Sequence, residues 1–341
     1  MMRLPRFQFV APRSLAEAAD VLAGASPGDA MIVAGGTDLI PNMKRRQQVP
    51  DTLVGLRRIA ELRGVHNGDG YRIGSGVTLT ELIGALQPRS PYDGLRQAAA
   101  QVATPLLRNM GTIGGNLCLD TRCNYYDQNY EWRKAIDFCM KKDGTTCWVA
   151  TSSPKCLAVS STDTAPALMA LDASVTLLSA RGSRTIPVAA LYQNDGIHYL
   201  TRKADEIVTA VELPRRDGWR STYWKLRRRG SFDFPVLSVA AAVKLARDGV
   251  VEDARIVLGA VTSQPVLAVD AAAALVGAPL TDDGMAIAAD RAARPARPMD
   301  NTDFTLHWRK RMTAAFVGYA LRELRGDDMR STRYRIARQL L

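Results

Sequence analysis

The spacing of apolar and polar residues in the first part of the chain predicts a small β-α-β unit. Two short apolar runs, FQFV (7–10) and AMIV (30–33), have the length and composition of strands. Between them, SLAEAADVLAG (14–24) has a helical composition with capping signals at both ends. A third run, TLVGL (52–56), predicts another strand. We expect a parallel sheet that is complete near residue 56.

Strands and helices alternate through the rest of the chain. Residues 71–110 begin with a strand pattern and become mostly helical, whereas 165–192 are expected to form strands joined by the turn RGS. A further strand is predicted at 206–214, and the polar segment RRDG (215–218) follows it as a linker. Beyond the linker a new unit alternates again and ends in an amphipathic helix at 307–324. The pattern therefore predicts an α+β protein with more than one domain.

The composition is that of a globular protein with a basic surface. Of the 341 residues, 47% are hydrophobic and 23% are charged, so the chain can bury a large core without disulfides. The net charge of +11 suits nucleic acid, an anionic cofactor or acidic partner subunits, but few aromatic residues and dispersed basic residues disfavour nucleic acid. No apolar run approaches the ~20 residues that span a bilayer, and the N-terminus lacks a signal-peptide core. We expect a cytoplasmic protein without membrane contact.

Two glycine pairs follow apolar segments and are candidates for anion binding. VAGGTDL (33–39) places Gly35 and Gly36 directly after a predicted strand, and GTIGGN (111–116) combines a hydroxyl residue, a glycine pair and an Asn amide. Such turns let backbone N–H groups converge on an anion because no Cβ obstructs them. Each pair alone is also explained as a tight turn, but two pairs suit the two phosphates of a dinucleotide. Neither matches the G-x-G-x-x-G fingerprint, so an ordinary Rossmann NAD site is disfavoured.

Four segments resemble, in order and spacing, the FAD-binding subunits of the xanthine dehydrogenase, or molybdenum hydroxylase, family. They are VAGGTDLIP (33–41), ATPLLRNMGTIGGNL (103–117), STDTAPALMALDA (161–173) and YWKLRRRGSFDFPVLSVAAAV (223–243). The resemblance covers almost the whole chain. It implies a PCMH-type FAD-binding domain, made of a small β-α-β subdomain and a mixed α+β subdomain. A flavoprotein C-terminal α+β domain is expected to follow.

The resemblance also implies how the chain divides into domains. The two parts of the FAD-binding domain are expected at 1–56 and 57–215, with a cysteine-rich iron–sulfur insertion at about 118–158 in the second part. The flavoprotein C-terminal domain is expected at 216–326, and a C-terminal tail at 327–341.

A set of FAD-binding residues follows from the same resemblance. The expected contacts are Val33, Ala34, Gly35, Gly36, Thr37, Asp38, Leu39, Thr112, Gly114, Gly115, Asn116, Asp163, Val208 and Lys225. Asp163 is equally well explained as a helix N-cap, and Lys225 as a solvated lysine on a strand. A cation beside the flavin would stabilise its reduced, anionic form.

All five cysteines lie within residues 118–156, and four of them have the spacing C-x15-C-x7-C-x8-C. Four thiolates can ligate an iron–sulfur cluster or a metal ion. Structural zinc usually shows tight C-x2-4-C pairs, which are absent here, and disulfides need an oxidising compartment. Buried structural thiols are the remaining alternative. The pattern favours a [4Fe–4S] cluster from which nearby aromatic residues exclude water. These are Tyr125, Tyr126, Tyr130, Trp132, Phe138 and Trp148.

This insertion narrows the resemblance to the β subunits of the 4-hydroxybenzoyl-CoA reductases, in which a cluster-bearing insertion is the distinguishing element. GGNLCLDTRC (114–123) and DTAPALMALDA (163–173) carry the match. By resemblance the cluster ligands are Cys123, Cys139, Cys147 and Cys156. Cys118 is expected to be a buried thiol near the flavin.

The resemblance implies an electron-transfer subunit that does not act on substrate alone. His66, His198 and His307 are far apart in the sequence, and no catalytic triad or carboxylate pair stands out. Ferredoxin is the expected electron donor, and electrons would pass through [4Fe–4S] and FAD to [2Fe–2S] clusters on a small subunit. They would end at a molybdenum–pterin centre on a large subunit, where 4-hydroxybenzoyl-CoA is dehydroxylated to benzoyl-CoA. The expected assembly is a dimer of heterotrimers.

Two other functions are compatible with these residues. One is the FAD subunit of a xanthine-, aldehyde- or carbon-monoxide-type dehydrogenase that passes electrons outward. The insertion argues against it, because outward transfer of two electrons to NAD needs no additional cluster. The other is a basic, zinc-stapled binding module with no redox role.

Overall fold

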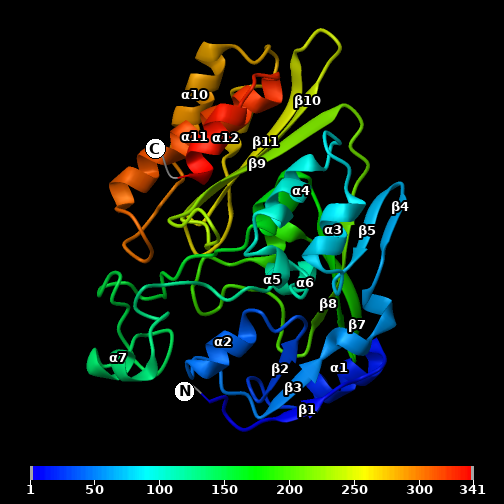
Figure 1. Ribbon diagram of the computed structural model, residues 1–341, viewed down its shortest axis with the longest axis vertical. Helices are drawn as coiled ribbons and strands as arrows, with labels where there is room; N and C mark the ends of the chain where they lie inside the picture. Colours follow the sequence, from blue (N-terminus) through cyan, green and yellow to red (C-terminus); the bar gives the residue numbers. More distant parts are fainter. Residues whose placement is uncertain (1–2, 339–341) are drawn as a thin grey trace.

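The computed structural model describes residues 3–338, which form three β-sheets, surrounding helices and one loop-rich lobe (Figure 1). The N-terminal part is a parallel sheet with the strand order β1-β3-β2. Its elements are β1 (Gln8–Val10), α1 (Leu15–Ala23), β2 (Ala30–Val33), α2 (Leu39–Lys44) and β3 (Thr52–Gly55). Ser14 caps α1 by accepting a hydrogen bond from the Glu17 backbone N–H, and Gly24 follows the last helical residue. The predicted β-α-β unit and its parallel sheet are confirmed.

The second part is an antiparallel sheet with the strand order β4-β5-β8-β6-β7. Its strands are β4 (Val65–Gly68), β5 (Gly70–Gly74), β6 (Ser174–Ser179), β7 (Gly182–Pro187) and β8 (Ile207–Leu213). Its helices are α3 (Leu79–Ala85), α4 (Asp93–Ala100), α5 (Pro105–Arg108), α6 (Ile113–Leu117) and α8 (Thr164–Ala170). One apolar core joins residues of β5, β6 and β8 to residues of α3, α4, α6 and α8. Short 3-10 turns lie at Leu56–Arg58, Ala60–Leu62 and Val188–Leu191.

Helix α8 corrects the strand prediction for the start of segment 165–192. All seven of its residues are buried, so the apolar run shows no polar face from which a helical period could be recognised. Its Ala, Leu and Met residues have high helix propensity, and its contacts to the third sheet, α4 and α6 explain the complete burial. The turn RGS does join two strands, β6 and β7.

The C-terminal part is an antiparallel sheet covered by helices on both faces. Its strands are β9 (Trp219–Leu226), β10 (Leu237–Leu245), β11 (Val251–Gly259) and β12 (Val266–Leu267), in the order β12-β11-β10-β9. Its helices are α9 (Val269–Ala273), α10 (Asp282–Ala293), α11 (Leu306–Arg325) and α12 (Arg330–Ala337). Helix α11 packs on one face, while α4 and α8 of the second part pack on the other. The predicted helix at 307–324 is confirmed, but α12 follows it within the segment expected to be a tail.

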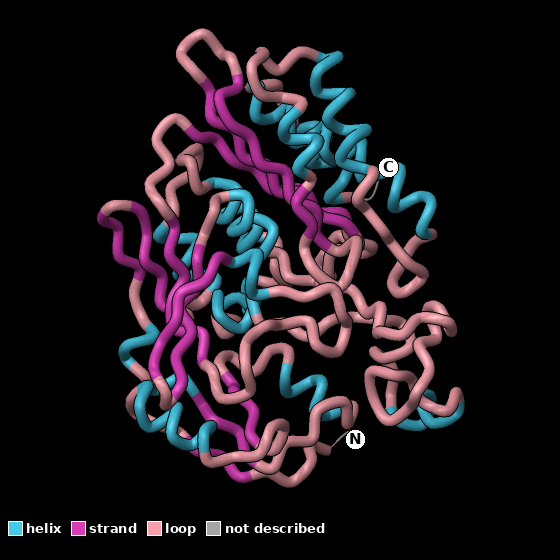
Figure 2. The backbone as a smooth tube through the Cα atoms, turned by 180° about the vertical axis from the view of Figure 1, so that it is seen from behind, coloured by secondary structure: helices cyan, strands magenta, loops and turns pink. Residues whose placement is uncertain are grey.

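The cysteine-rich segment forms a lobe that lies apart from the three sheets (Figures 1 and 2). Most of it is loop, and its one helix is α7 (Tyr130–Ala135). The lobe begins and ends at a single antiparallel bridge. There the Arg122 N–H donates to the Val159 carbonyl (2.8 Å) and the Val159 N–H donates to the Arg122 carbonyl (2.7 Å).

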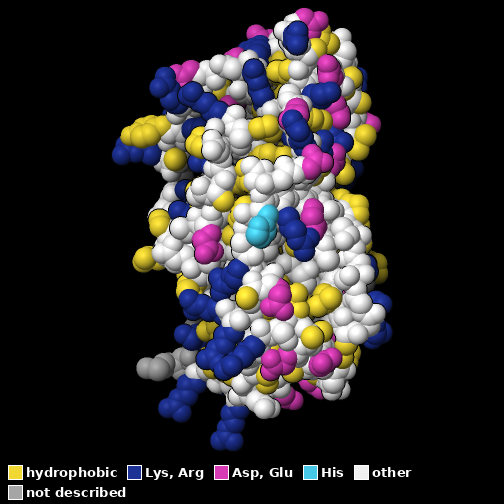
Figure 3. All heavy atoms as spheres, turned by 90° about the vertical axis from the view of Figure 1, so that its right-hand side faces the viewer, with side chains coloured by type: hydrophobic (Ala, Val, Ile, Leu, Met, Phe, Trp, Pro, Cys, Tyr) yellow, Lys and Arg dark blue, Asp and Glu magenta, His cyan; other side chains and the backbone are white. Residues whose placement is uncertain are grey.

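The surface shows charges of both signs on the face drawn in Figure 3. Basic side chains are spread over the height of this face and are interspersed with acidic ones, so they form no single long basic track there. Within residues 3–338, no helix is both long enough and apolar enough to cross a membrane.

Candidate functional site

A cavity of about 910 Å³ lies where the three parts of the chain meet. Its wall includes the end of β2, the start of α2, the N-terminal turn of α6, part of β8 and the loop from Arg229 to Phe234. This volume is in the range of small-molecule and cofactor sites. The cavity therefore collects segments that are far apart in the sequence.

The first glycine pair forms the turn between β2 and α2 and needs glycine at both positions. A Cβ on Gly35 would lie 1.9 Å from the Met110 carbonyl oxygen, and Gly36 has a φ of +70°. The close approach at Gly35 brings this turn against the residues that precede the second glycine motif. Asp38 follows the turn, and its carboxylate accepts a hydrogen bond from Asn42 Nδ2 (3.1 Å) instead of capping α2.

The second glycine pair, unlike the first, lies in the first turn of a helix. Thr112 is the N-cap of α6, and its Oγ1 accepts a hydrogen bond from the Gly115 N–H (3.0 Å). The Gly114 N–H donates to the Ser75 carbonyl (2.9 Å), and a Cβ on Gly114 would lie 2.7 Å from the Ser75 Cβ. These glycines therefore let α6 pack closely against the second sheet, and both N–H groups have protein partners.

Asn116 lines the cavity but is held by its neighbours. Its Oδ1 accepts hydrogen bonds from Thr162 Oγ1 (2.9 Å) and from the backbone N–H (3.1 Å) and Oγ1 (2.6 Å) of Thr164. The amide thus fixes α6 against the start of α8.

The structure brings thirteen of the fourteen predicted FAD contacts to this one cavity. Those that line it are Val33, Ala34, Gly35, Gly36, Thr37, Asp38, Leu39, Thr112, Gly114, Gly115, Asn116, Asp163 and Val208. Lys225 is not among the lining residues. It lies behind the wall, where its ammonium pairs with Asp163 (2.9 Å) and donates to the Gln101 carbonyl (2.9 Å).

Asp163 and Lys225 form a buried ion pair between the second and third parts of the chain. Asp163 occupies the N-cap position of α8 but makes no side-chain capping bond. Instead it accepts hydrogen bonds from the Tyr223 hydroxyl (2.6 Å) and the Lys225 ammonium (2.9 Å). Burial raises the pKa of the Asp163 carboxyl and lowers the pKa of the Lys225 ammonium, and the attraction between the two opposes both shifts. Lys225 is therefore a buried partner of Asp163 rather than a solvated lysine.

Several cavity residues were not assigned from the sequence. Gln48, Asp120, Arg122, Tyr199, Phe232 and Phe234 line the cavity. Arg122 pairs with Asp38, and its guanidinium carbon lies 4.4 Å from the centre of the Phe234 ring. The Arg, Gly and Phe residues at 227–234 mark this loop in the sequence, but no pattern there indicates that it faces the glycine turn.

Cys118 also lines this cavity and is half-buried rather than buried as expected. Burial raises the pKa of its thiol, and Arg202 opposes this shift. The three histidines, in contrast, are exposed and do not line the cavity.

The other four cysteines line a second, small cavity inside the lobe. Cys123, Cys139, Cys147 and Cys156 are each 5–6% exposed, and all five thiols of the chain are free. Burial is the main reason why the pKa is raised to about 12 for Cys123 and to about 11 for Cys156. Cysteines that are up to 33 positions apart in the sequence thus surround one cavity.

Only some of the predicted aromatic residues surround these thiols. Tyr125, Tyr126 and Trp148 line the cysteine cavity, together with Lys141. Tyr130 and Trp132 are on α7 and are about 40% exposed, and Phe138 does not line the cavity either. Three of the six aromatic side chains therefore line the cavity directly, and Trp132 packs beside one of them, Tyr125 (ring centroids 6.5 Å apart).

The four thiols have the donor chemistry of an iron–sulfur site but not its finished geometry. Among residues 3–338, no group of three or more His, Cys, Asp or Glu side chains is arranged so that it could hold a metal ion. Four cysteines from one segment facing one cavity, with a lysine beside them, nevertheless form the ligand set that such clusters use.

Comparison with known families supports a flavin-binding role. Residues 5–216 match the family described as "FAD binding domain in molybdopterin dehydrogenase". Residues 221–324 match the "CO dehydrogenase flavoprotein C-terminal domain".

Similar proteins are subunits of several oxidoreductases. The chain is 31% identical to the nicotinate dehydrogenase FAD-subunit of Eubacterium barkeri over 82% of each chain. It is 33% identical to the aldehyde oxidoreductase FAD-binding subunit of Escherichia coli K12, over 70% of this chain and 76% of that subunit. Among solved structures, carbon monoxide dehydrogenase from Hydrogenophaga pseudoflava matches with a TM-score of 0.77 and 27% identity, covering 95% of this chain and 98% of that one.

Proposed function

Because the chain belongs to the family of FAD-binding subunits of the molybdenum hydroxylases, we propose that it is the electron-transfer subunit of a 4-hydroxybenzoyl-CoA reductase. The observation that carries this proposal is the convergence of Cys123, Cys139, Cys147 and Cys156 on one cavity beside the cavity lined by the FAD motifs. An ordinary flavin subunit has no need of four thiols at that place.

We assign FAD to the cavity of about 910 Å³. Gly35 and Gly36 line this cavity, and a turn without Cβ atoms suits the approach of an anionic group to its backbone. Asp38 and Asn116 are fixed by hydrogen bonds within the wall, so the site is preformed. When bound, FAD supplies one- and two-electron transfer chemistry.

We assign a [4Fe–4S] cluster to the four cysteines of the lobe. Burial keeps these thiols away from water, and the Lys141 ammonium beside them would offset the negative charge of thiolate ligands. Loading requires the thiols to lose their protons, which the raised pKa values of Cys123 and Cys156 oppose in the cluster-free chain. When bound, the cluster supplies one-electron transfer.

The proposed function includes partners that supply the remaining chemistry. A large molybdenum subunit would bind 4-hydroxybenzoyl-CoA, a small subunit would carry [2Fe–2S] clusters, and ferredoxin would donate electrons. In this scheme the chain holds its cofactors and docks its partners in the cytoplasm, as a member of a dimer of heterotrimers. The division at residues 56, 215 and 326 is retained as part of the proposal.

A second candidate is the FAD subunit of a dehydrogenase that passes electrons outward. It is favoured by the similarity to nicotinate, aldehyde and carbon monoxide enzymes over most of the chain. The two candidates differ in iron content, because only the reductase assignment gives the lobe cysteines a cluster to bind.

Anaerobic purification with measurement of iron, sulfide and flavin tests the proposal. We expect about four irons and one FAD per chain. Cys139→Ser should lose the iron and keep the flavin, whereas the matched control Cys118→Ser should keep the iron. Flavin without iron in the unmodified chain would leave only the second candidate, and a colourless chain would exclude both.

A further inference from the structure

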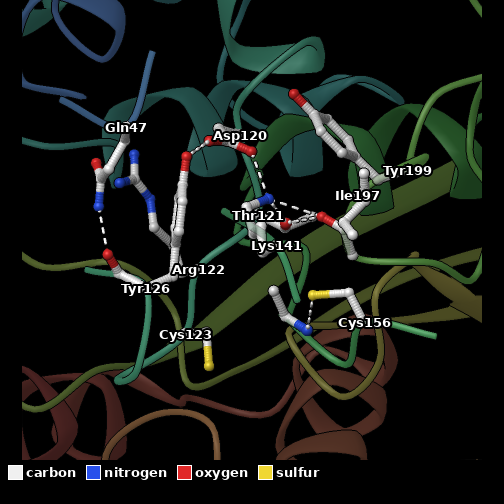
Figure 4. A network of polar contacts seen from close by, with 12 residues as sticks. Gln47, Asp120, Thr121, Arg122, Cys123, Tyr126, Lys141, Cys156, Ile197 and Tyr199 are labelled. Carbon is white, nitrogen blue, oxygen red and sulfur yellow. Dashed lines mark hydrogen bonds and ion pairs between the residues drawn. The ribbon is translucent and has the colours of Figure 1, made fainter. Parts of the chain in front are cut away.

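The two cavities share one wall, which is built mainly from residues 119–123. Asp120 and Arg122 line the FAD cavity, and Cys123 lines the cysteine cavity. Tyr126 and Lys141 line the cysteine cavity and turn their polar ends toward Asp120 (Figure 4). One short stretch of chain thus has a cofactor cavity on each side.

Asp120 is the polar centre of this wall. Its carboxylate accepts hydrogen bonds from Lys141 Nζ (2.8 Å), the Tyr126 hydroxyl (3.1 Å) and Gln48 Nε2 (3.3 Å). The Asp120 and Lys141 side chains are 9% and 5% exposed. Gln48 and Asp120 line the FAD cavity, so the carboxylate connects groups from both sides of the wall.

Lys141 extends the connection to the cysteines. Its ammonium also donates to Thr121 Oγ1 (2.5 Å) and to the Gly196 carbonyl (2.7 Å). The Gly196 N–H in turn donates to the Cys156 carbonyl (2.9 Å). Two side-chain hydrogen bonds, Asp120–Lys141 and Lys141–Gly196, and one backbone hydrogen bond therefore lead from the FAD cavity to the Cys156 backbone.

We propose that Asp120 and Lys141 are positioning residues that couple the two cavities, so that FAD binding stabilises the arrangement of the four lobe cysteines. This inference rests on the proposed FAD site. FAD in the cavity would exclude water from Asp120 and so strengthen its attraction to Lys141. Three hydrogen bonds already satisfy the carboxylate and limit the cost of its desolvation. By thermodynamic linkage, any ligand that binds the ordered arrangement of the cysteines must tighten FAD binding by the same factor by which FAD tightens the binding of that ligand.

The test is the rate at which each cysteine is alkylated by N-ethylmaleimide in the full-length chain, freed of iron and flavin, with and without added FAD. Peptide mass spectrometry resolves the five cysteines. Cys118 lines the FAD cavity and reports FAD binding directly, while Cys123 and Cys156 report the coupling. We expect FAD to protect Cys118 and to slow alkylation of Cys123 and Cys156 about tenfold.

The variant Asp120→Asn/Lys141→Met removes both charges, so neither is left buried alone. At FAD concentrations that fully protect Cys118, the double variant should lose the protection of Cys123 and Cys156. If Asp120 and Lys141 had only a structural role, the double variant would be alkylated faster than the unmodified chain by the same factor with and without FAD. The matched control, Lys244→Met/Glu252→Gln, removes an exposed Lys–Glu pair (2.7 Å) of the C-terminal sheet and should behave as the unmodified chain.

If the double variant fails to fold, Tyr126→Phe takes its place in the test. This change removes one hydroxyl from the wall and should weaken the coupling between the two cavities. The coupling is refuted if FAD protects Cys118 but not Cys123 and Cys156 in the unmodified chain, or if both wall variants retain full protection. Failure of FAD to protect Cys118 would instead refute the FAD site, and the coupling with it.

Discussion

At the scale of single residues, Gly35 is a position where the fold leaves no room for a side chain. Its missing Cβ would lie 1.9 Å from the Met110 carbonyl oxygen, which belongs to the backbone and cannot rotate away. Gly35→Ala should therefore separate the two glycine motifs. We expect FAD affinity to fall at least tenfold and the free energy of unfolding to fall by about 1–3 kcal/mol. Fluorescence titration with FAD and urea unfolding measure the two effects.

Gly84→Ala provides the matched control for this change. Gly84 lies in α3, has no heavy atom within 4 Å of its missing Cβ, and does not line the cavity. Alanine there should leave FAD binding unchanged and add up to about 1 kcal/mol of stability. Unaltered FAD binding by Gly35→Ala would contradict the assignment of the cofactor to this turn.

The sequence predicted the cavity residues better than it predicted their contacts. Gly35, Gly36 and Val208 line the cavity as the family resemblance implied. The position of Lys225 behind Asp163 could not be predicted, because it depends on how two distant strands and a helix stack. Asp120 carried no signal either, since a single carboxylate in a cysteine-rich segment has no motif that indicates its partners.

At the scale of elements, helix α11 is held to the third sheet by a buried arginine. Arg309 donates to the carbonyls of Val236 (2.9 Å), Ala260 (2.7 Å) and Met299 (2.8 Å). Its side chain is fully buried, and burial lowers its pKa to about 10. Arg309→Met would remove a donor from all three carbonyls, although the Met299 carbonyl would keep the Asn301 N–H (2.8 Å). We therefore expect the free energy of unfolding to fall by about 3 kcal/mol or more.

Thermal unfolding followed by circular dichroism measures this loss. Arg311→Met is the control, since Arg311 is exposed on the same helix and its replacement should change stability by less than about 0.5 kcal/mol. An equal effect of the two substitutions would show that the carbonyl contacts do not hold the helix.

Elements were predictable where an apolar run is short and bounded by turn signals, or where a helix has one polar face. The parallel strands near residues 8, 30 and 52 are of the first kind and the long helix at 307–324 is of the second, and all were found. Helix α8 was missed because it is buried on every side. In the lobe, order comes from polar contacts between distant residues rather than from a repeating pattern, so α7 and its orientation were not predicted.

At the scale of the whole molecule, the ion pair of Asp163 and Lys225 joins the FAD-binding part to the C-terminal part. Asp163→Asn would leave the Lys225 ammonium buried without a charged partner. We expect this to lower the free energy of unfolding by about 3–5 kcal/mol. Asp163→Asn/Lys225→Met should recover much of the loss, because neither charge remains buried. Urea unfolding of both variants measures the difference.

Asp290→Asn tests whether the effect comes from burial. Asp290 pairs with Arg294 at 3.2 Å, but both side chains are at least 70% exposed, so its loss should cost less than about 1 kcal/mol. If the double Asp163/Lys225 variant were no more stable than Asp163→Asn alone, the unpaired ammonium would not be the cause of the loss.

The bridge between Arg122 and Val159 has a consequence for how the cysteine-rich lobe is joined to the fold. Residues 123–158 leave and rejoin the rest of the chain at the two residues of this bridge, which are hydrogen-bonded to each other through their backbones. Because the bridge is antiparallel, a two-residue turn between Arg122 and Val159 would shorten the polypeptide and leave both flanking segments in place. Surface excursions that leave and return at one point are tolerated well by existing folds. The cysteine-rich lobe can accordingly be added or removed at this one place, and only the few side chains that meet across the junction have to adapt.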